Sequence, residues 1–182
     1  MTAVSEGAID AREFRSALGR FATGVTVITT EVQGVTHGMT ANAFMSVSLN
    51  PPLVAVAVDN RAKINQFLAQ GERYGVSILA VHHDKLSTHF AGRPQGEIEF
   101  QFVHHHEMPL IQDAVAHVVA RVVATHLAGD HTLYVGQVEY LDWQDGHPLL
   151  FYAGSYRQLD VGRLPRAHWA EDEFALFTIG PM

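Results

Sequence analysis

The sequence has 182 residues, of which 47% are hydrophobic and 17% charged, a composition typical of one globular domain with a substantial core. Its net charge of −7, with scattered basic residues, argues against binding to a nucleic-acid backbone, and the absence of cysteine excludes disulfides, thiolate zinc sites and iron–sulfur clusters. No apolar run approaches the roughly 20 residues of a membrane helix, and the N-terminus lacks the pattern of a signal peptide, so we expect a cytoplasmic protein.

The first predicted element is a helix over residues 10–21, because apolar residues recur there with the spacing of one helix face: Phe14, Ala17, Leu18 and Phe21. Asp10 and Glu13 have the spacing of a capping box at its start. Runs of β-branched and apolar residues then predict strands over residues 25–30, 35–39, 46–49 and 53–58. The last of these strands is apolar on both faces, so we expect it to be central in its sheet.

Short helices are predicted next, over residues 61–69 and 82–90, with a strand over residues 74–79 between them. Residues 97–103 alternate between polar and apolar side chains and form either a strand or a mobile connector. The chain continues with two long strands and a short one, over residues 115–127, 132–143 and 148–152.

Hairpins link most of these strands, which favours a mainly β fold, an antiparallel barrel with a few short helices, over a doubly wound sheet. No Gly-x-Gly-x-x-Gly follows a strand, so a Rossmann domain is not expected. We expect a single domain over residues 1–182, with a core at about 10–159 and a C-terminal tail at 160–182.

Hydroxyl and amide side chains gather between Thr40 and Ser48, just before the apolar strand. In one interpretation they are ordinary hydrogen-bonding residues of a turn. In the other they hold a phosphate or the polar edge of a flat heteroaromatic ring.

Two further groups allow the same pair of interpretations. The Gly-Asp-His sequence that ends at His131 is either a plain turn or a turn that brings a histidine to the mouth of the barrel. Gly154, Tyr156 and Arg157 form either an ordinary strand end or an aromatic lid and a cation beside a flat ligand.

Neither a metal site nor a nucleophilic catalyst is predicted. Side chains of the consecutive His104, His105 and His106 point to alternate faces of an extended chain, so they do not converge on one ion. The other histidine group, His82, His83 and His89, has no familiar ligand spacing. There is no cysteine and no Gly-x-Ser-x-Gly motif.

Five segments occur in an order and at a spacing that together resemble a known family: F-R-S-A-L-G-R-F-A-T-G-V-T-V-I-T-T, G-M-T-A-N-A-F-M-S-V-S-L-N-P-P-L-V, F-A-G-R, G-D-H and P-L-L-F-Y-A-G-S-Y-R-Q-L. The chain resembles the short-chain flavin reductases, the reductase components of two-component flavin-dependent monooxygenases. The resemblance spans residues 14–159. It implies a split β-barrel of the FMN-binding type that works as a homodimer. In this family NADH or NADPH reduces FMN or FAD, and the reduced flavin passes to a partner monooxygenase.

The resemblance also implies roles for individual residues. Those expected to line the isoalloxazine are Thr23, Gly24, Val25, Thr40, Ala41 and Asn42. Those expected at the ring edge and ribityl chain are Ser46, Val47 and Ser48, and those near the flavin phosphate or tail are Lys63, Phe90 and Ala91. His131 is the candidate catalytic residue and is expected to approach, orient and tune the nicotinamide or the flavin face. Tyr156 is expected to contact the nicotinamide nucleotide, and Arg93 to support either nucleotide.

Several alternatives stay open. Residues 94–113 depart from the family pattern, which leaves the choice between NADH and NADPH undecided, as is the choice between FMN and FAD. Trp169, Phe174 and Phe177 of the tail are expected to pack on the barrel or on a partner subunit. One alternative function is a barrel that holds flavin or haem tightly and reduces another small molecule, or does not turn over. The other is a structural or partner-binding barrel.

Overall fold

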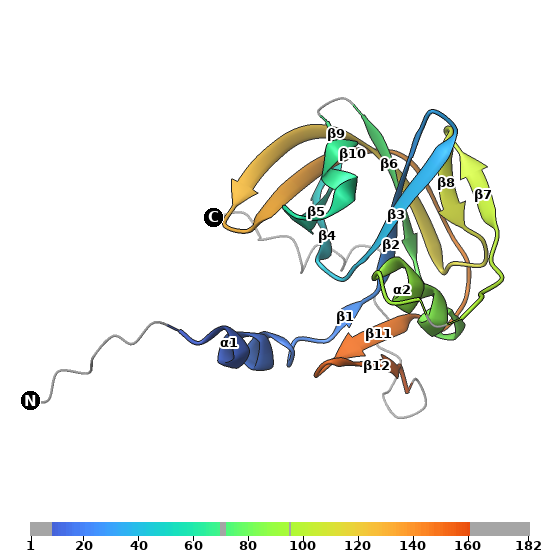
Figure 1. Ribbon diagram of the computed structural model, residues 1–182. Coiled ribbons are helices and arrows are strands. Elements are labelled where there is room, and N and C mark those ends of the chain that lie inside the picture. Colours follow the sequence, from blue (N-terminus) through green and yellow to red (C-terminus); the bar gives the residue numbers. More distant parts are fainter. Residues whose placement is uncertain (1–8, 70–71, 95, 161–182) are drawn as a thin grey trace, which may run out of the picture.

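Seven strands form the large antiparallel sheet in a computed structural model that describes residues 9–69, 72–94 and 96–160 (Figure 1). Their order across the sheet is β3-β2-β6-β9-β10-β5-β4. Their bounds are β2 Thr26–Val32, β3 Val35–Ala41, β4 Phe44–Leu49, β5 Pro52–Asp59, β6 Arg73–Ile78, β9 Ala116–Ala128 and β10 His131–Trp143.

The sheet curls into a barrel because its two edge strands, β3 and β4, follow each other in the chain with only Asn42 and Ala43 between them. The backbone N–H of Ala57 on β5 donates to the carbonyl of Ala43 at 3.0 Å, which holds this connection against the sheet. Among the described strands β3 and β4 do not pair with each other, so the barrel is split at this edge. The predicted mainly β split barrel is confirmed.

Two small sheets lie beside the barrel. One consists of β1 (Thr23–Gly24), β11 (Leu149–Tyr152) and β12 (Ser155–Gln158), and the other of β7 (Phe102–His105) and β8 (Met108–Ile111). The first is attached to the barrel through Leu149, whose carbonyl accepts from Val25 at 3.2 Å and whose N–H donates to Leu79 at 2.8 Å.

The short helices differ in part from the prediction. In place of the helix predicted over residues 82–90 there is a 3₁₀ turn, η2 (Val81–His83), followed by the helix α2 (Asp84–Phe90). Residues 61–69 contain only the 3₁₀ turn η1 (Lys63–Gln66). Asp59 accounts for the shorter element, since its carboxylate accepts from the backbone of Arg61 and its carbonyl from the amide of Asn65, which holds the chain in turns. The strand β7 begins only at Phe102, so the connector before it is mostly irregular.

The core has two main parts. Inside the barrel, β5 contributes buried valines, and Ile28 of β2 and Tyr74 of β6 pack with them. The second part lies where the strands β2 and β6 meet α2 and β11, and its members are Val25, Val27, Leu79, Leu86, Ile111 and Leu149. Burial of these side chains fixes α2 and the small sheet to the barrel.

The N-terminal helix α1 (Ala11–Leu18) projects away from the barrel (Figure 1). The Asp10 carboxylate accepts from the N–H groups of Arg12 at 2.8 Å and Glu13 at 3.1 Å, which is the Asp10 half of the predicted capping box. The predicted apolar face is present, but none of the helix is buried, and Phe21 just after it is 74% exposed. Within the part of the chain that the structure describes, the apolar face of α1 is therefore uncovered.

No helix within the described ranges is long and apolar enough to cross a membrane. The expected packing of Trp169, Phe174 and Phe177 lies outside the described residues.

Candidate functional site

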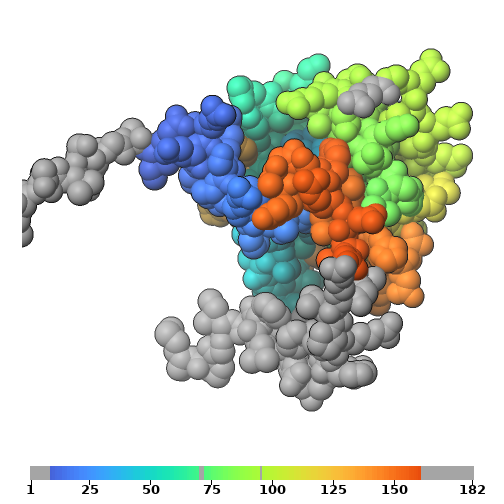
Figure 2. All heavy atoms as spheres, turned by 90° about the horizontal axis from the view of Figure 1, so that it is seen from below, coloured from blue at the N-terminus to red at the C-terminus, as the bar shows by residue number. Residues whose placement is uncertain are grey.

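A cavity of about 280 Å³ opens where β2, β3, the end of α2 and the β11–β12 hairpin meet. Figure 2 shows this face, with the hairpin in orange between the blue N-terminal segment and the green region of α2. The residues that line the cavity are Val25, Thr40, Asn42, Ala91, Arg93, Phe151 and Tyr156. All but Phe151 belong to the set that the resemblance singles out.

Hydrogen bonds hold the β3 side of this cavity in place. The Thr40 hydroxyl donates to the carbonyl of Ser87 on α2 at 2.6 Å. The amide of Asn42 donates to the Thr23 hydroxyl at 3.3 Å, and the Thr26 hydroxyl donates to the carbonyl of Ala41 at 2.8 Å. The hydroxyl and amide residues of this stretch thus connect β1, β2, β3 and α2, and they also line the cavity.

The helix α2 packs directly on β3 because residue 38 is glycine. A Cβ at Gly38 would lie 2.7 Å from the ring of Phe90, closer than side-chain carbons approach one another. The Phe90 ring also packs edge-on against Phe100 and lies near Phe102. Phe90 therefore anchors the helix and places Ala91 at the cavity, without lining the cavity itself.

Two aromatic rings form the hairpin side of the cavity. Phe151 on β11 and Tyr156 on β12 are paired across the hairpin, with ring centroids 5.9 Å apart and an interplanar angle of 67°. The Tyr156 hydroxyl shares a hydrogen bond with the Ser87 hydroxyl at 2.8 Å. Sequence reasoning missed both Ser87 and Phe151, since Ser87 lies on a helix and Phe151 looks like any apolar strand residue.

The remaining predicted residues do not line this cavity. Ser46, Val47 and Ser48 are on the edge strand β4, where the register shifts around Val47. This segment is largely exposed, as is Lys63 at the start of η1.

His131 also lies outside the cavity lining, at the β9–β10 turn opposite the end of β5. Its Nδ1 atom is 2.7 Å from a carboxylate oxygen of Asp130, and this hydrogen bond holds the Asp130 pKa below its ordinary value. Nearby, the Arg61 guanidinium contacts both carboxylate oxygens of Asp59, at 3.0 and 2.6 Å, and holds the Asp59 pKa far below its usual range. Exposed charges therefore surround His131.

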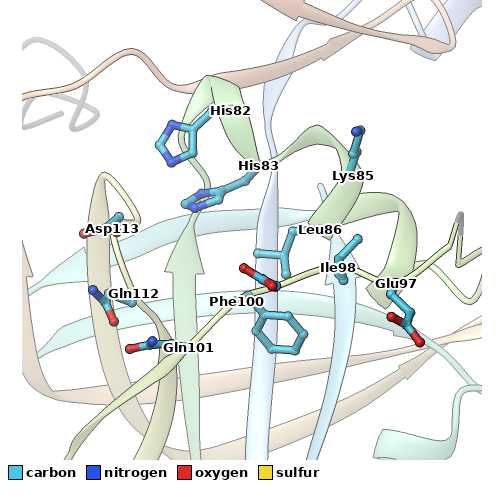
Figure 3. Close-up of a pocket in the computed structure, with 11 residues that line it drawn as sticks. His82, His83, Lys85, Leu86, Glu97, Ile98, Phe100, Gln101, Gln112 and Asp113 are labelled. Atoms are coloured by element: carbon cyan, nitrogen blue, oxygen red, sulfur yellow. The ribbon is translucent and has the colours of Figure 1, made fainter.

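A second cavity, of about 510 Å³, lies between α2 and the connector that leads to β7 (Figure 3). Leu86, Ile98 and Phe100 form its apolar part, and the histidines of η2 lie near Asp113 at one end. The other polar residues that line it are Lys85, Glu97, Glu99, Gln101 and Gln112. Three carboxylates against one lysine make this cavity a poor site for a phosphate, and none of the predicted flavin residues lines it.

The histidine groups have separate partners. His104 lies 3.6 Å from a Glu31 carboxylate oxygen, whereas the His105 ring stacks on Tyr140 with centroids 4.5 Å apart. His83 accepts from the N–H of Ala80 at 3.2 Å, and burial lowers its pKa. Within the part of the chain that the structure describes, no group of three or more histidine or acidic side chains is placed to hold a metal ion.

Comparison with known proteins gives concordant matches. The family model described as flavin reductase like domain matches residues 18–160. An NADH-dependent flavin reductase of a Rhodococcus species is 51% identical over 150 residues, which cover 81% of this chain and 85% of that protein. The reductase component of 4-hydroxyphenylacetate 3-monooxygenase from Thermus thermophilus is 41% identical and covers 80% of this chain and 95% of its own. The solved flavin reductase PheA2 superposes with a TM-score of 0.80 at 48% identity, over 83% of this chain and 99% of that one.

Proposed function

Because this chain belongs to the flavin reductase-like family, we propose that it is an enzyme that uses NADH to reduce FMN or FAD and passes the reduced flavin to a partner monooxygenase. We assign NADH rather than NADPH as the electron donor, because a similar relative is named an NADH-dependent flavin reductase. The named relatives also include the reductase component of a monooxygenase, which supports an oxygenase as the recipient. We also propose that the protein is cytoplasmic, as the sequence predicts, because the reaction requires NADH.

The observation that carries this proposal is the convergence of family-matching residues on one cavity. The segments that contain Val25, Thr40, Ala91 and Tyr156 are far apart in the sequence, yet all reach the same opening. Its volume of about 280 Å³ lies just below the range of roughly 300–1,000 Å³ for complete small-molecule pockets. We infer that it receives the ring system, while the rest of the flavin extends over the surface, as suits a molecule that must enter, react and leave.

The lining residues fit a flavin chemically. When bound, the flavin ring supplies the acceptor for the hydride of NADH. Asn42, oriented by Thr23, presents an amide to the polar edge of such a ring, and the Arg93 guanidinium offers a charge-assisted partner for a phosphate. The Phe151 ring supplies flat apolar surface for the flavin, and Tyr156, which pairs with it across the hairpin, faces the nicotinamide nucleotide in this proposal. These residues bind and orient; hydride transfer itself requires no acid or base from the protein at the transferring atoms.

His131, Lys63 and the β4 residues Ser46, Val47 and Ser48 keep the roles that the resemblance gives them as part of this proposal. Each lies outside the cavity lining, so we assign them to the parts of the flavin or of the nicotinamide nucleotide that extend beyond the cavity.

We further propose that the protein is a homodimer. No residue in the described ranges covers the apolar face of α1, and the edge strand β4 exposes Met45, Val47 and Leu49, the last at 77%. Apolar surface of this kind on a helix and on a free sheet edge is typical of a face that another protein covers. A second copy is the partner that is always present at matching concentration. Sedimentation equilibrium of the wild type and of Leu18→Glu tests this, with a dimer expected only for the wild type.

The proposed reaction is tested by following NADH absorbance with purified protein, with and without FMN, FAD or riboflavin, and again with NADPH. Flavin-dependent oxidation of NADH is expected, and the rates rank the flavins. A yellow colour that persists through dialysis, without turnover of added flavin, would instead identify a protein that holds flavin tightly. Absence of flavin binding at micromolar concentration would leave a structural barrel.

A further inference from the structure

Ser87 connects two sides of the flavin cavity without lining it. It lies in the middle of α2 and is 0% exposed. Its carbonyl accepts from the Thr40 hydroxyl at 2.6 Å, and its own hydroxyl shares a hydrogen bond with the Tyr156 hydroxyl at 2.8 Å. Thr40 belongs to β3 and Tyr156 to β12, so one buried residue contacts two walls of the same cavity.

The helix does not depend on the Ser87 hydroxyl for its position. The anchor is the Phe90 ring, which packs against Gly38 and the neighbouring phenylalanines, while Leu86 is buried in the core beneath. We therefore attribute to the Ser87 hydroxyl a role in holding Tyr156, which it contacts, rather than a role in fixing α2.

The two contacts of Ser87 are chemically separable. Thr40 uses the backbone carbonyl, which every residue at position 87 retains. Tyr156 uses the side-chain hydroxyl, which alanine removes. Without it the phenol loses its hydrogen-bond partner on α2, while the ring keeps its packing against Phe151. Alanine at position 87 thus removes the hydrogen bond to Tyr156 on the hairpin wall and keeps the hydrogen bond to Thr40 on the β3 wall.

We propose that Ser87 is a positioning residue: its hydroxyl orients Tyr156 for the nicotinamide nucleotide, while its carbonyl independently orients Thr40 on the flavin side. This inference rests on the proposed function, in which Tyr156 contacts that nucleotide. In this proposal one residue of α2 sets the position of the NADH site relative to the flavin site.

The test is a double-mutant cycle with Ser87→Ala, Tyr156→Phe and the double variant. The readouts are KM and kcat for NADH, the Kd of the unreactive NAD⁺ by calorimetry, and the Kd of oxidised flavin by fluorescence quenching. We expect each single variant to raise KM for NADH and Kd for NAD⁺ by about 3- to 10-fold, the loss of one hydrogen bond. The double variant is expected to be no weaker than either single one, because both remove the same bond. The flavin Kd stays within about twofold.

Two further variants separate the contacts. Thr40→Val removes the donor to the Ser87 carbonyl. It should therefore raise the Kd of flavin by about 3- to 10-fold and leave the Kd of NAD⁺ unchanged. Thr88→Ala is the matched control, since Thr88 is the next residue on α2 and its hydroxyl donates to the Asp84 carbonyl instead. It should change neither dissociation constant.

Additive effects of Ser87→Ala and Tyr156→Phe, or an unchanged NAD⁺ affinity in Ser87→Ala, would overturn the inference while an active wild type upheld the proposed function. A wild type that does not oxidise NADH with any flavin would overturn both. If Ser87→Ala does not fold, Tyr156→Phe alone decides, because it breaks the same bond from the hairpin; unchanged NAD⁺ affinity would then reject the inference.

Discussion

The two regions to which the family resemblance assigns nucleotide binding are built in different ways. Around the cavity, α2, β3 and β12 are joined by partly buried contacts, with Ser87 between Thr40 and Tyr156 and Phe90 against Gly38. At the β9–β10 turn, His131 lies among exposed charges. Exposed ion pairs are screened by salt and contribute little, whereas buried hydrogen bonds and packing fix geometry. The cavity is therefore the more rigidly held of the two regions, and the His131 region is held by weaker contacts.

The largest effect is expected from Gly38→Ala, which breaks the packing of α2 on β3. The added Cβ lies 2.7 Å from the Phe90 ring, and other phenylalanines limit how far that ring can move. Overpacking of this kind costs about 1–3 kcal/mol of folding free energy, measured by chemical denaturation, and flavin affinity falls with it. Gly146→Ala is the control, since its Cβ would lie at an ordinary 3.5 Å from Val115. Equal stability of the two variants would contradict the anchoring role of Phe90.

Next in size is Arg93→Gln, which removes the cation at the cavity. Loss of a charge-assisted hydrogen bond to a phosphate is expected to raise the Kd of FMN by about tenfold. Riboflavin, which lacks the phosphate, should bind the variant and the wild type equally. Fluorescence titration with both flavins measures the difference, and an equal loss for both would place Arg93 away from the phosphate.

A smaller effect is expected from His131→Ala, because His131 is partly exposed and outside the cavity lining. KM for NADH should rise, or kcat fall, by about threefold, as for the loss of one weak hydrogen bond. Steady-state kinetics with saturating flavin give both constants. Unchanged values would remove His131 from the nucleotide site.

The smallest effect is expected from Glu139→Gln, in an ion-pair network on the β-sheet. Arg73 donates to Glu139 at 2.6 Å and Arg121 at 2.7 Å, and these contacts hold the Glu139 pKa below its ordinary value. A carboxyl with a lowered folded-state pKa stabilises the fold above its unfolded-state pKa, and this stabilisation is lost as the pH falls through the folded-state value. The variant should therefore lose about 0.5 kcal/mol or less at neutral pH.

The pH dependence provides the check on Glu139. Below the ordinary glutamate pKa of about 4.3, the stability difference between Glu139→Gln and the wild type should shrink. Glu99→Gln, on the exposed connector, serves as the control substitution. A difference that grows on acidification would contradict the assigned direction of the pKa shift.

Much of the fold was predictable because strand patterns and the Asp10 cap are local signals, and the structure confirms both. The helix predicted over residues 61–69 failed because local hydrogen bonds from Asp59 favour turns. Ser87 could not be found in advance, since its two partners lie 47 and 69 residues away in the chain. Phe151 gave no signal either, because its role comes from the hairpin that pairs it with Tyr156.

The central claim is that flavin binds in the cavity between β3, α2 and the β11–β12 hairpin. A crystal structure of the protein soaked with FMN tests it most directly. The account predicts the isoalloxazine ring against Asn42 and Phe151, with the phosphate towards Arg93. A flavin found in the larger cavity beside His82 and Glu97, with the hairpin cavity empty, would contradict it.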